Sequence, residues 1–371
     1  MNERQRVLTI LNGGVPDRVP WLGDLTYWAH ALEMRGQVPP GFQRSEAYYD
    51  FHRELGVGFY LQGYEPFRRI YDETITVEER REGNRHIQIV HTPLGALREV
   101  RTFLPASFTE APTEDFVKSP ADLPILRYWF EHTRFEPDYA EAARRLPLVQ
   151  DLGVVLCYLP KTPFMQLVVL LSGIETVVDL WMDARAELEA TLEVIERKAD
   201  EAAAIALASP AECLMIPENL SSEVVGKRFY ELYVRGYETK WNQCIREAGK
   251  FSFIHLDGTV RGLLREVVSA GFRVIEAVTP APVGDMPMSE MATLAGHGPG
   301  EAPAILWGGL PGVYFTDLVS DAEFDRHVRE MLAVMTGEPR YVLGVADQVP
   351  PDGLRRRVAR VRELVERYGA Y

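Results

Sequence analysis

The chain has 371 residues, of which 46% are hydrophobic and 25% charged, the composition of an ordinary soluble protein. Its formal net charge of −14 argues against nucleic acid or an anionic membrane as a main partner, because an acidic surface repels both. No run of 18 apolar residues is present, and the first residues lack the apolar core of a signal peptide, so we expect a cytoplasmic protein. The three cysteines have no CxxC spacing, which suggests neither a disulfide framework nor a zinc ribbon.

The first third of the sequence predicts helices followed by a small antiparallel sheet. Apolar periodicity indicates helices at residues 3–11, 24–35 and 45–55. Alternating β-prone runs separated by turn-like residues then predict a meander with strands at residues 74–77, 86–90 and 96–100. The proline-containing and acidic stretch 106–124 is interpreted as a connector.

After Leu146 the pattern alternates between strand and helix, which is typical of a parallel sheet or barrel. The predicted strands are residues 148–157, 212–216, 251–255, 274–276, 304–307 and 341–345. The predicted helices are residues 174–181, 184–208, 227–248, 262–270, 288–294, 321–335 and 354–368. An eight-stranded barrel would need two strands more than these six. The region of Asp24 and residues 57–61 are candidates for the missing strands.

The strand Phe251–Ile254 ends in His255 and Asp257, followed by Gly258. Because side chains alternate along a strand, His255 and Asp257 should point to the same side, where they could act as metal ligands or acid/base groups. The alternative is a packed histidine and an aspartate that caps the next helix.

Other predicted strand ends also carry polar residues, and in a barrel these ends meet at one rim. They are Glu218, Asn219, Glu276, Asp347 and Gln348. The carboxylates could instead cap helices, hold loops or pair with an arginine. With Asp257, the strand ends carry four carboxylates, which would repel one another in one cleft, so we expect a cationic group to compensate their charge.

Four stretches resemble the uroporphyrinogen decarboxylase superfamily and occur in its motif order. They are residues 4–20, the turn at 92–97, the strand end at 255–258 and the closing run 343–351. The resemblance implies an α/β fold of the (β/α)8 TIM-barrel type, with an N-terminal helical extension and a small antiparallel β-meander. It also implies a single domain over residues 1–371, divided into the extension with its meander (1–125) and the main part of the barrel (126–371).

Within this superfamily, the sequence is more similar to the cobalamin-dependent methyltransferases than to the true decarboxylases. The decarboxylases carry an Arg-Gln-Ala-Gly-Arg-Tyr element that binds substrate carboxylates, whereas residues 21–30 contain neither arginine. The zinc-dependent methyltransferases use His-x-Cys at the strand end that matches His255, and a later Cys near the C-terminus. Here Asp257 and Asp347 stand at those two positions, which makes the ligand set harder and more oxygen-rich.

The resemblance therefore predicts a corrinoid-dependent methyltransferase. A divalent ion, with Zn²⁺ as the first choice, would be held by His255, Asp257 and Asp347 and act as a Lewis acid on a substrate oxygen. A methyl group would pass from an O-methyl substrate, such as an aryl methyl ether, to cob(I)alamin on a separate corrinoid protein, which makes the chain an O-demethylase. Glu218 and Glu276 are candidates for a further ligand or, with His255, for catalytic groups.

The predicted substrate pocket takes its aromatic wall from the N-terminal region, although aromatic residues at helical spacing are more often core. Its members are Asp24, Tyr27, Trp28, Tyr60, Asn219 and Gln348.

Two other functions stay open at this point. One is a decarboxylase of a non-porphyrin carboxylic acid, in which Asp24 or His255 handles the proton. The other is a catalytically silent barrel that keeps only a binding surface. The oligomeric state is left open between a monomer and a homodimer.

Overall fold

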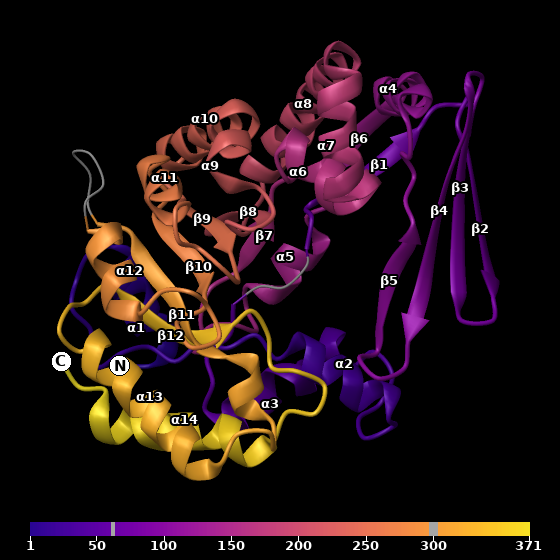
Figure 1. Cartoon of the computed structure of the whole chain (residues 1–371). Helices are drawn as coiled ribbons and strands as arrows, with labels where there is room; N and C mark the ends of the chain where they lie inside the picture. The colour runs from indigo at the N-terminus through magenta and orange to yellow at the C-terminus, as the bar shows by residue number, and fades with distance from the viewer. Residues whose placement is uncertain (61–63, 297–302) are drawn as a thin grey trace.

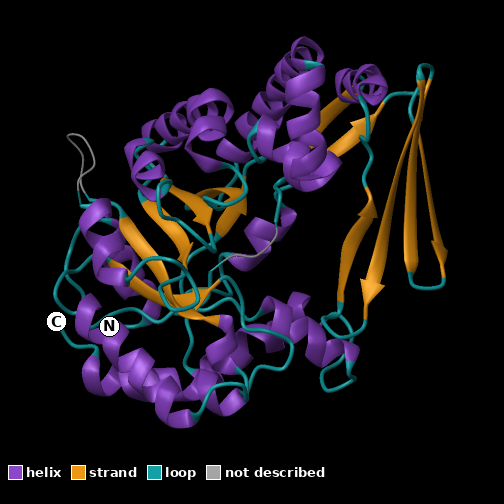
Figure 2. Ribbon diagram, viewed as in Figure 1, coloured by secondary structure: helices purple, strands orange, loops and turns teal. Residues whose placement is uncertain are grey.

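The centre of the fold is a six-stranded parallel β-sheet, seen in a computed structural model that describes residues 1–60, 64–296 and 303–371. The strands lie side by side in chain order and are flanked by helices (Figures 1 and 2). They are β7 (Leu156–Tyr158), β8 (Cys213–Leu220), β9 (Phe251–Leu256), β10 (Val274–Val278), β11 (Ile305–Pro311) and β12 (Tyr341–Ala346). The predicted alternation of strand and helix is therefore confirmed.

Two short segments connect the outer strands of this sheet. A single parallel bridge joins Trp21 to β12, a second joins Leu22 to Gly58, and a third joins Phe59 to Gly153 just before β7. The backbones approach so closely that a Cβ on Gly58 would lie 2.8 Å from the backbone oxygen of Leu152 and 3.0 Å from that of Trp21. The sheet is thus barrel-like, although its edges are linked by bridges and not by a continuous ladder within the described residues.

A cluster of buried side chains inside the curved sheet comes from all six strands and from both connecting segments. The helix α1 (Glu3–Leu11) adds Val7, Ile10 and Leu11 to it. The remaining members are Leu22, Tyr60, Val154, Leu156, Cys213, Met215, Phe253, Val274, Ile305, Trp307 and Val342. Because side chains two positions apart share a face, the residues that follow Phe253 and Val274 by two also point inward.

Helices cover the outer face of the sheet through a second, larger cluster of buried side chains. The regular helices after β7 are α6 (Pro163–Gln166), α7 (Gly173–Asp183), α8 (Arg185–Leu207), α9 (Gly226–Phe229), α10 (Arg235–Glu247), α11 (Leu264–Ser269), α12 (Met288–Ala295), α13 (Asp321–Met335) and α14 (Arg355–Tyr368). Two π-helical segments, η3 (Leu167–Ser172) and η4 (Tyr230–Val234), extend α6 and interrupt the predicted helix 227–248. The 3₁₀ turn η5 (Gly312–Phe315) follows β11.

The N-terminal part contains the three predicted helices and a larger sheet than predicted. α1 is followed by α2 (Thr26–Met34), the 3₁₀ turn η1 (Phe42–Arg44) and α3 (Glu46–Leu55). The meander has four strands, β2 (Thr76–Glu82), β3 (Arg85–Thr92), β4 (Gly95–Leu104) and β5 (Thr109–Glu114), and stands apart from the central sheet in Figure 1. A separate antiparallel pair is formed by β1 (Phe67–Tyr71), which precedes the meander in the chain, and β6 (Thr133–Pro137), which follows it together with η2 (Pro120–Asp122), α4 (Leu123–Glu131) and α5 (Ala140–Arg145).

Two predictions of local structure are wrong. The stretch 106–124 is not only a connector, because Thr109–Glu114 pairs with β4. The predicted strand 148–157 is a strand only from Leu156, because the chain leaves α5 in turns that place Leu148 N and Val149 N on Arg145 O. Of the stretch 57–61 offered as a further strand, Leu61 lies outside the described residues.

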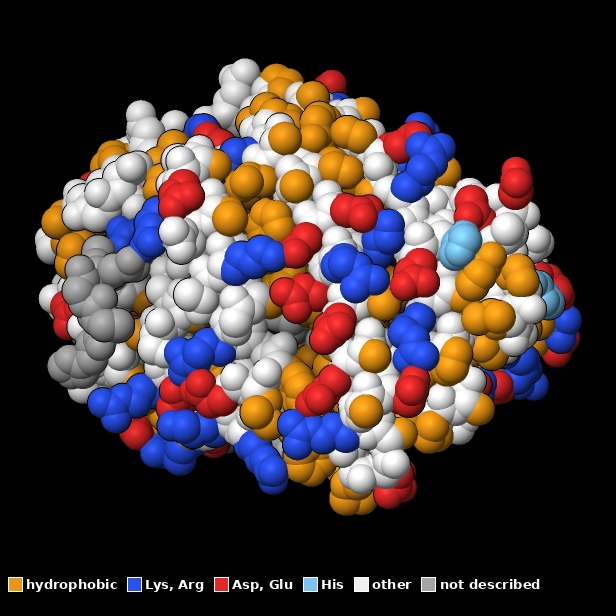
Figure 3. Space-filling model, turned by 90° about the horizontal axis from the view of Figure 1, so that it is seen from above, with side chains coloured by type: hydrophobic (Ala, Val, Ile, Leu, Met, Phe, Trp, Pro, Cys, Tyr) orange, Lys and Arg blue, Asp and Glu red, His pale blue; other side chains and the backbone are white. Residues whose placement is uncertain are grey.

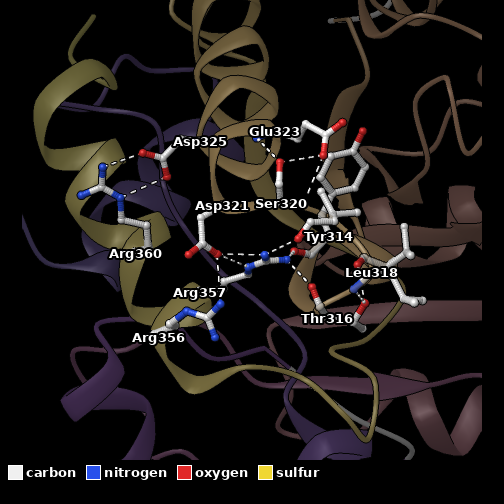
Figure 4. A network of polar contacts seen from close by, with 12 residues as sticks. Tyr314, Thr316, Leu318, Ser320, Asp321, Glu323, Asp325, Arg356, Arg357 and Arg360 are labelled. Atoms are coloured by element: carbon white, nitrogen blue, oxygen red, sulfur yellow. Dashed lines mark hydrogen bonds and ion pairs between the residues drawn. The ribbon is translucent and has the colours of Figure 1, made fainter.

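The C-terminal helix is tied to the loop after β11 by one buried arginine (Figure 4). Arg357 donates to the backbone oxygens of Tyr314, Thr316 and Val319, and its Nη2 lies 2.8 Å from Asp321 Oδ1 at the start of α13. The guanidinium satisfies carbonyls that the irregular loop leaves unpaired, so α14 fixes the loop beyond one strand end.

Candidate functional site

The register between β9 and β10 places His255 directly opposite Glu276. Both side chains belong to the inward face, two residues after Phe253 and Val274 of the interior cluster. His255 Nδ1 lies 2.6 Å from Glu276 Oε2, so the ring donates to the carboxylate and the Nε2 atom is the one left for a ligand. Glu276 thus pairs with a histidine, not with an arginine.

Tyr60 extends this pair by one more hydrogen bond. Its hydroxyl donates to Glu276 Oε1 over 2.8 Å, and its ring packs on Trp307 with the centroids 4.7 Å apart. Both oxygens of Glu276 are therefore engaged, one by Tyr60 and one by His255. The result is a buried chain of three side chains from three different segments, which fixes the orientation of the imidazole.

Two further carboxylates surround the imidazole. Asp257 Oδ2 lies 4.0 Å from His255 Nε2, and Asp347 follows the end of β12. Burial alone would lower the pKa of His255, but the charges of Glu276, Asp257 and Asp347 outweigh it and raise the pKa to about 9. Burial, with the charges of Glu276 and Asp257, raises the pKa of Asp347. The surrounding carboxylates therefore favour positive charge on the imidazole.

A cavity of about 260 Å³ opens beside the rim. Four predicted site residues line it, namely Asn219, His255, Asp347 and Gln348. Its other walls come from Glu65, Arg69, Tyr158, Pro160, Lys161, Gln166, Leu170 and Pro217. The volume is small for a ligand pocket, which suits a compact ligand. Acidic and basic side chains gather together across the middle of the face seen from above (Figure 3).

Two of the lining residues have an uncommon backbone conformation. Asn219 has φ = +57° and Asp347 has φ = +70°, in the left-handed region where non-glycine residues are rare, although Asn and Asp are the most tolerant of them. Such strain persists only where the surrounding structure imposes it, and it is concentrated at functional sites.

Asp24 lies next to this cavity wall and is itself buried. Its Oδ1 accepts from Thr26 N over 2.7 Å, and its Oδ2 accepts from Gln348 Nε2 over 3.2 Å. Burial raises the pKa of Asp24 to about 7 despite the hydrogen bonds from Thr26. Asp24 thus positions the Gln348 amide, which lines the cavity.

Glu218 is turned away from His255 toward the loop after β7. Within β8, its carboxylate accepts from Thr162 N over 2.6 Å and from Thr162 Oγ1 over 3.1 Å. Burial raises the pKa of Glu218 to about 7. Its catalytic role stays a prediction, and its evident structural role is to hold the Thr162 backbone.

Lys161, which sequence reasoning missed, is the residue before Thr162 and lines the cavity. Its ammonium group donates to the backbone oxygen of Pro217 and, over 2.6 Å, to Asn219 Oδ1. The signal in the sequence is a lysine just beyond the end of a predicted strand, and the expectation of a cation at the rim points to it.

The aromatic residues predicted for the substrate wall have different surroundings. Trp28 is buried against Phe51, with ring centroids 5.4 Å apart, as expected of a core residue. The Tyr27 hydroxyl donates to the backbone oxygen of Ser107 and so ties α2 to the meander. Neither residue is among the described residues that line the cavity, and Tyr60 contributes through Glu276.

The donor set fits a divalent cation in part. A histidine whose Nδ1–H is held by a carboxylate is the usual form of a metal-ligating imidazole, and Asp257 lies close to the other ring nitrogen. Within the described ranges, however, no three His, Cys, Asp or Glu side chains form a group that could hold a metal ion. The set of His255, Asp257 and Asp347 therefore stays a prediction.

Comparison with known proteins adds a structural relative. The fold is similar to that of a methyltransferase from Methanosarcina mazei, with a TM-score of 0.64 over 99% of both chains and 13% sequence identity. No known protein family and no curated protein matches the sequence. At this identity the similarity shows a shared fold, namely a mixed α/β, TIM-barrel-like fold that a methyltransferase also uses. No helix in the described part of the chain is long and apolar enough to cross a membrane.

Proposed function

We propose that this protein is a corrinoid-dependent methyltransferase that removes a methyl group from an O-methyl substrate bound in the cavity beside His255. The observation that carries the proposal is the buried chain Tyr60–Glu276–His255, flanked by Asp257 and Asp347 at one rim of a methyltransferase-like fold. In the proposed reaction the methyl–oxygen bond breaks, the electron pair stays on the oxygen, and the methyl group passes to cob(I)alamin on a separate corrinoid protein.

The residues of the chain prepare the site for charge on the departing oxygen. Glu276 orients the His255 ring, and Tyr60 fixes Glu276 in turn. Asp257 and Asp347 surround the ring with negative charge that demands a cation. A divalent ion such as Zn²⁺, held by His255, Asp257 and Asp347, would supply Lewis acidity toward the substrate oxygen.

Metal content tests the ligand set. We expect about one equivalent of a divalent metal in the purified protein, and its loss in His255→Ala and Asp347→Ala. His132→Ala is a matched control, because His132 also pairs with a carboxylate, that of Asp72, but on the surface near α4. Equal metal content in wild type and His255→Ala would refute the ligand assignment.

Product analysis separates this proposal from a decarboxylase. With a methoxybenzoate and cob(I)alamin, a methyltransferase yields the hydroxybenzoate and methylcobalamin and leaves the carboxylate intact. A decarboxylase releases CO₂ and keeps the methoxy group. Release of CO₂ without demethylation would overturn the proposal. If neither methylcobalamin nor CO₂ forms, the result would favour the catalytically silent barrel.

A further inference from the structure

The loop that carries Lys161 is held in place on all sides. Gln166 Nε2 donates to the Lys161 backbone oxygen over 2.9 Å, and the Glu218 carboxylate anchors the next residue, Thr162. The side chain then crosses to the β8 end, where it meets Pro217 and Asn219. The ammonium group is therefore fixed at the cavity wall before any ligand binds.

The acceptors of this ammonium group are both uncharged. An ammonium group has three N–H donors, and the described part of the chain uses two of them, on the Pro217 carbonyl and the Asn219 amide. The left-handed conformation of Asn219, with φ = +57°, brings its amide to the lysine. The carboxylates of Glu218, Asp257 and Glu65 act on Lys161 through their charges, but none of them accepts a hydrogen bond from it within the described residues, so its third N–H donor is available to a ligand carboxylate.

The charges along the cavity wall also define a direction. Lys161 stands at the β7 and β8 side, whereas Asp347 lies at the end of β12, on the side of His255. A second cation, Arg69, also lines the cavity, but its charge is paired with that of Glu65 over 3.4 Å. An anionic group would be repelled from Asp347 and attracted to Lys161. The opposite end of the same ligand would then lie on the side of His255.

We infer that the cavity recognises substrates that carry a carboxylate, with Lys161 as the residue that binds this group and so determines specificity. The inference rests on the proposed function and names its substrate class, a small methoxy carboxylic acid. The carboxylate pairs with Lys161, and the methylated oxygen is directed toward His255. The cavity volume of about 260 Å³ suits a compact compound with a single ring.

The test is a binding measurement by calorimetry on the full chain, without cobalamin, using 4-methoxybenzoate and its neutral analogue 4-methoxybenzamide. The two probes have nearly the same size and differ in charge. We expect wild type to bind the acid about tenfold more tightly than the amide, the size of one hydrogen bond to a charged group. Lys161→Met should bring the ratio close to one, and Lys161→Arg should retain part of it.

Lys250→Met is the matched control. Lys250 also donates to a backbone carbonyl, that of Ser209, but at the opposite end of the sheet, directly before β9. The acid-to-amide ratio should be unchanged in this variant. A purely structural Lys161 would lower stability on substitution without changing the ratio.

The inference is overturned if wild type binds both probes equally, if neither probe binds, or if Lys161→Met keeps the wild-type ratio. Because the measurement needs no methyl transfer, its outcome is independent of the reaction. A preserved ratio in a protein that transfers no methyl group would refute the proposed function and leave carboxylate recognition standing. Methyl transfer without a preference for the acid would refute carboxylate recognition and leave the proposed function standing.

Discussion

At the scale of single residues, Tyr60 acts on the site only through Glu276. Tyr60→Phe removes one hydroxyl and leaves the ring packed on Trp307. Because such outer hydrogen bonds hold a ligand in its orientation, we expect metal affinity or methyl transfer to fall about tenfold with the fold intact. Tyr139→Phe is the control, since its hydroxyl binds the Ile205 carbonyl away from the site. Equal activity of Tyr60→Phe and wild type would refute the role of the chain of hydrogen bonds.

Asp24 provides a test through the pH dependence of stability. Its pKa is about 7 in the folded protein and near 3.8 when unfolded, so the folded state holds the proton between these values. Stability from this group is therefore present at low pH and is lost as pH rises toward 7. Asp24→Asn cannot ionise, so its stability relative to wild type should rise by up to about 4 kcal/mol between pH 4 and pH 8.

Denaturant unfolding across this pH range measures the difference. Asp17→Asn is a control without a trend in this range, because the Arg6 guanidinium lowers the pKa of Asp17 and the stability that this pair gives is nearly complete above the unfolded pKa of 3.8, so the difference from wild type should stay almost constant between pH 4 and pH 8. A pH-independent difference between Asp24→Asn and wild type would show that Asp24 is not buried as a neutral acid.

The sequence alone could predict which residues meet at the rim, but not their partners. Strand periodicity and strand ends are local features, and they single out His255, Asp347, Asn219 and Gln348, which line one cavity in the structure. The pairing of His255 with Glu276 depends on the register between two strands. The direction of Glu218 depends on a bulge-like register shift in β8 between Ile216 and Leu220, which no local pattern indicates.

At the scale of elements, the closing bridges depend on glycines where backbones nearly touch. A Cβ on Gly153 would collide with the backbone oxygen of Phe59. Gly153→Ala should therefore force the two segments apart and lower the free energy of unfolding by about 1–3 kcal/mol, the usual cost of overpacking. Thermal and denaturant unfolding measure the loss.

Gly236→Ala is the matched control for this substitution. Gly236 lies in α10 with no atom within 4 Å of an added Cβ, so alanine should stabilise the helix by up to about 1 kcal/mol. If Gly153→Ala were as stable as Gly236→Ala, the close approach at the bridge would be contradicted.

Elements with a clear local pattern, including the strands of the central sheet, agree with the prediction, whereas strands without such a pattern do not. The helix α13 has the predicted bounds, because its apolar periodicity and its Ser320 capping box are both local. β5 was missed because Pro112 and the acidic residues around it resemble a loop, whereas pairing with β4 makes the stretch a strand. The β1–β6 pair was also missed, because it is formed by pairing between segments that lie far apart in the sequence.

At the scale of the whole molecule, the N-terminal extension shares the core inside the central sheet. Residues 1–125 contribute α1, Leu22 and Tyr60 to the interior cluster and the two segments that link its outer strands. We therefore expect residues 126–371 alone to lack cooperative unfolding, whereas the full chain should unfold in a single transition. Circular dichroism during heating checks both. A cooperative transition in the fragment would show that the two parts are separate domains.

The most direct test of the proposed function is methyl transfer to free cob(I)alamin, followed by absorbance as methylcobalamin forms. The purified chain is mixed with O-, N- and S-methyl donors in turn, and a methoxybenzoate represents the favoured class. We predict methylcobalamin from the O-methyl acid, nearly none with His255→Ala and wild-type amounts with His132→Ala. If methylcobalamin forms from none of the three donor classes, the protein is not a corrinoid-dependent methyltransferase.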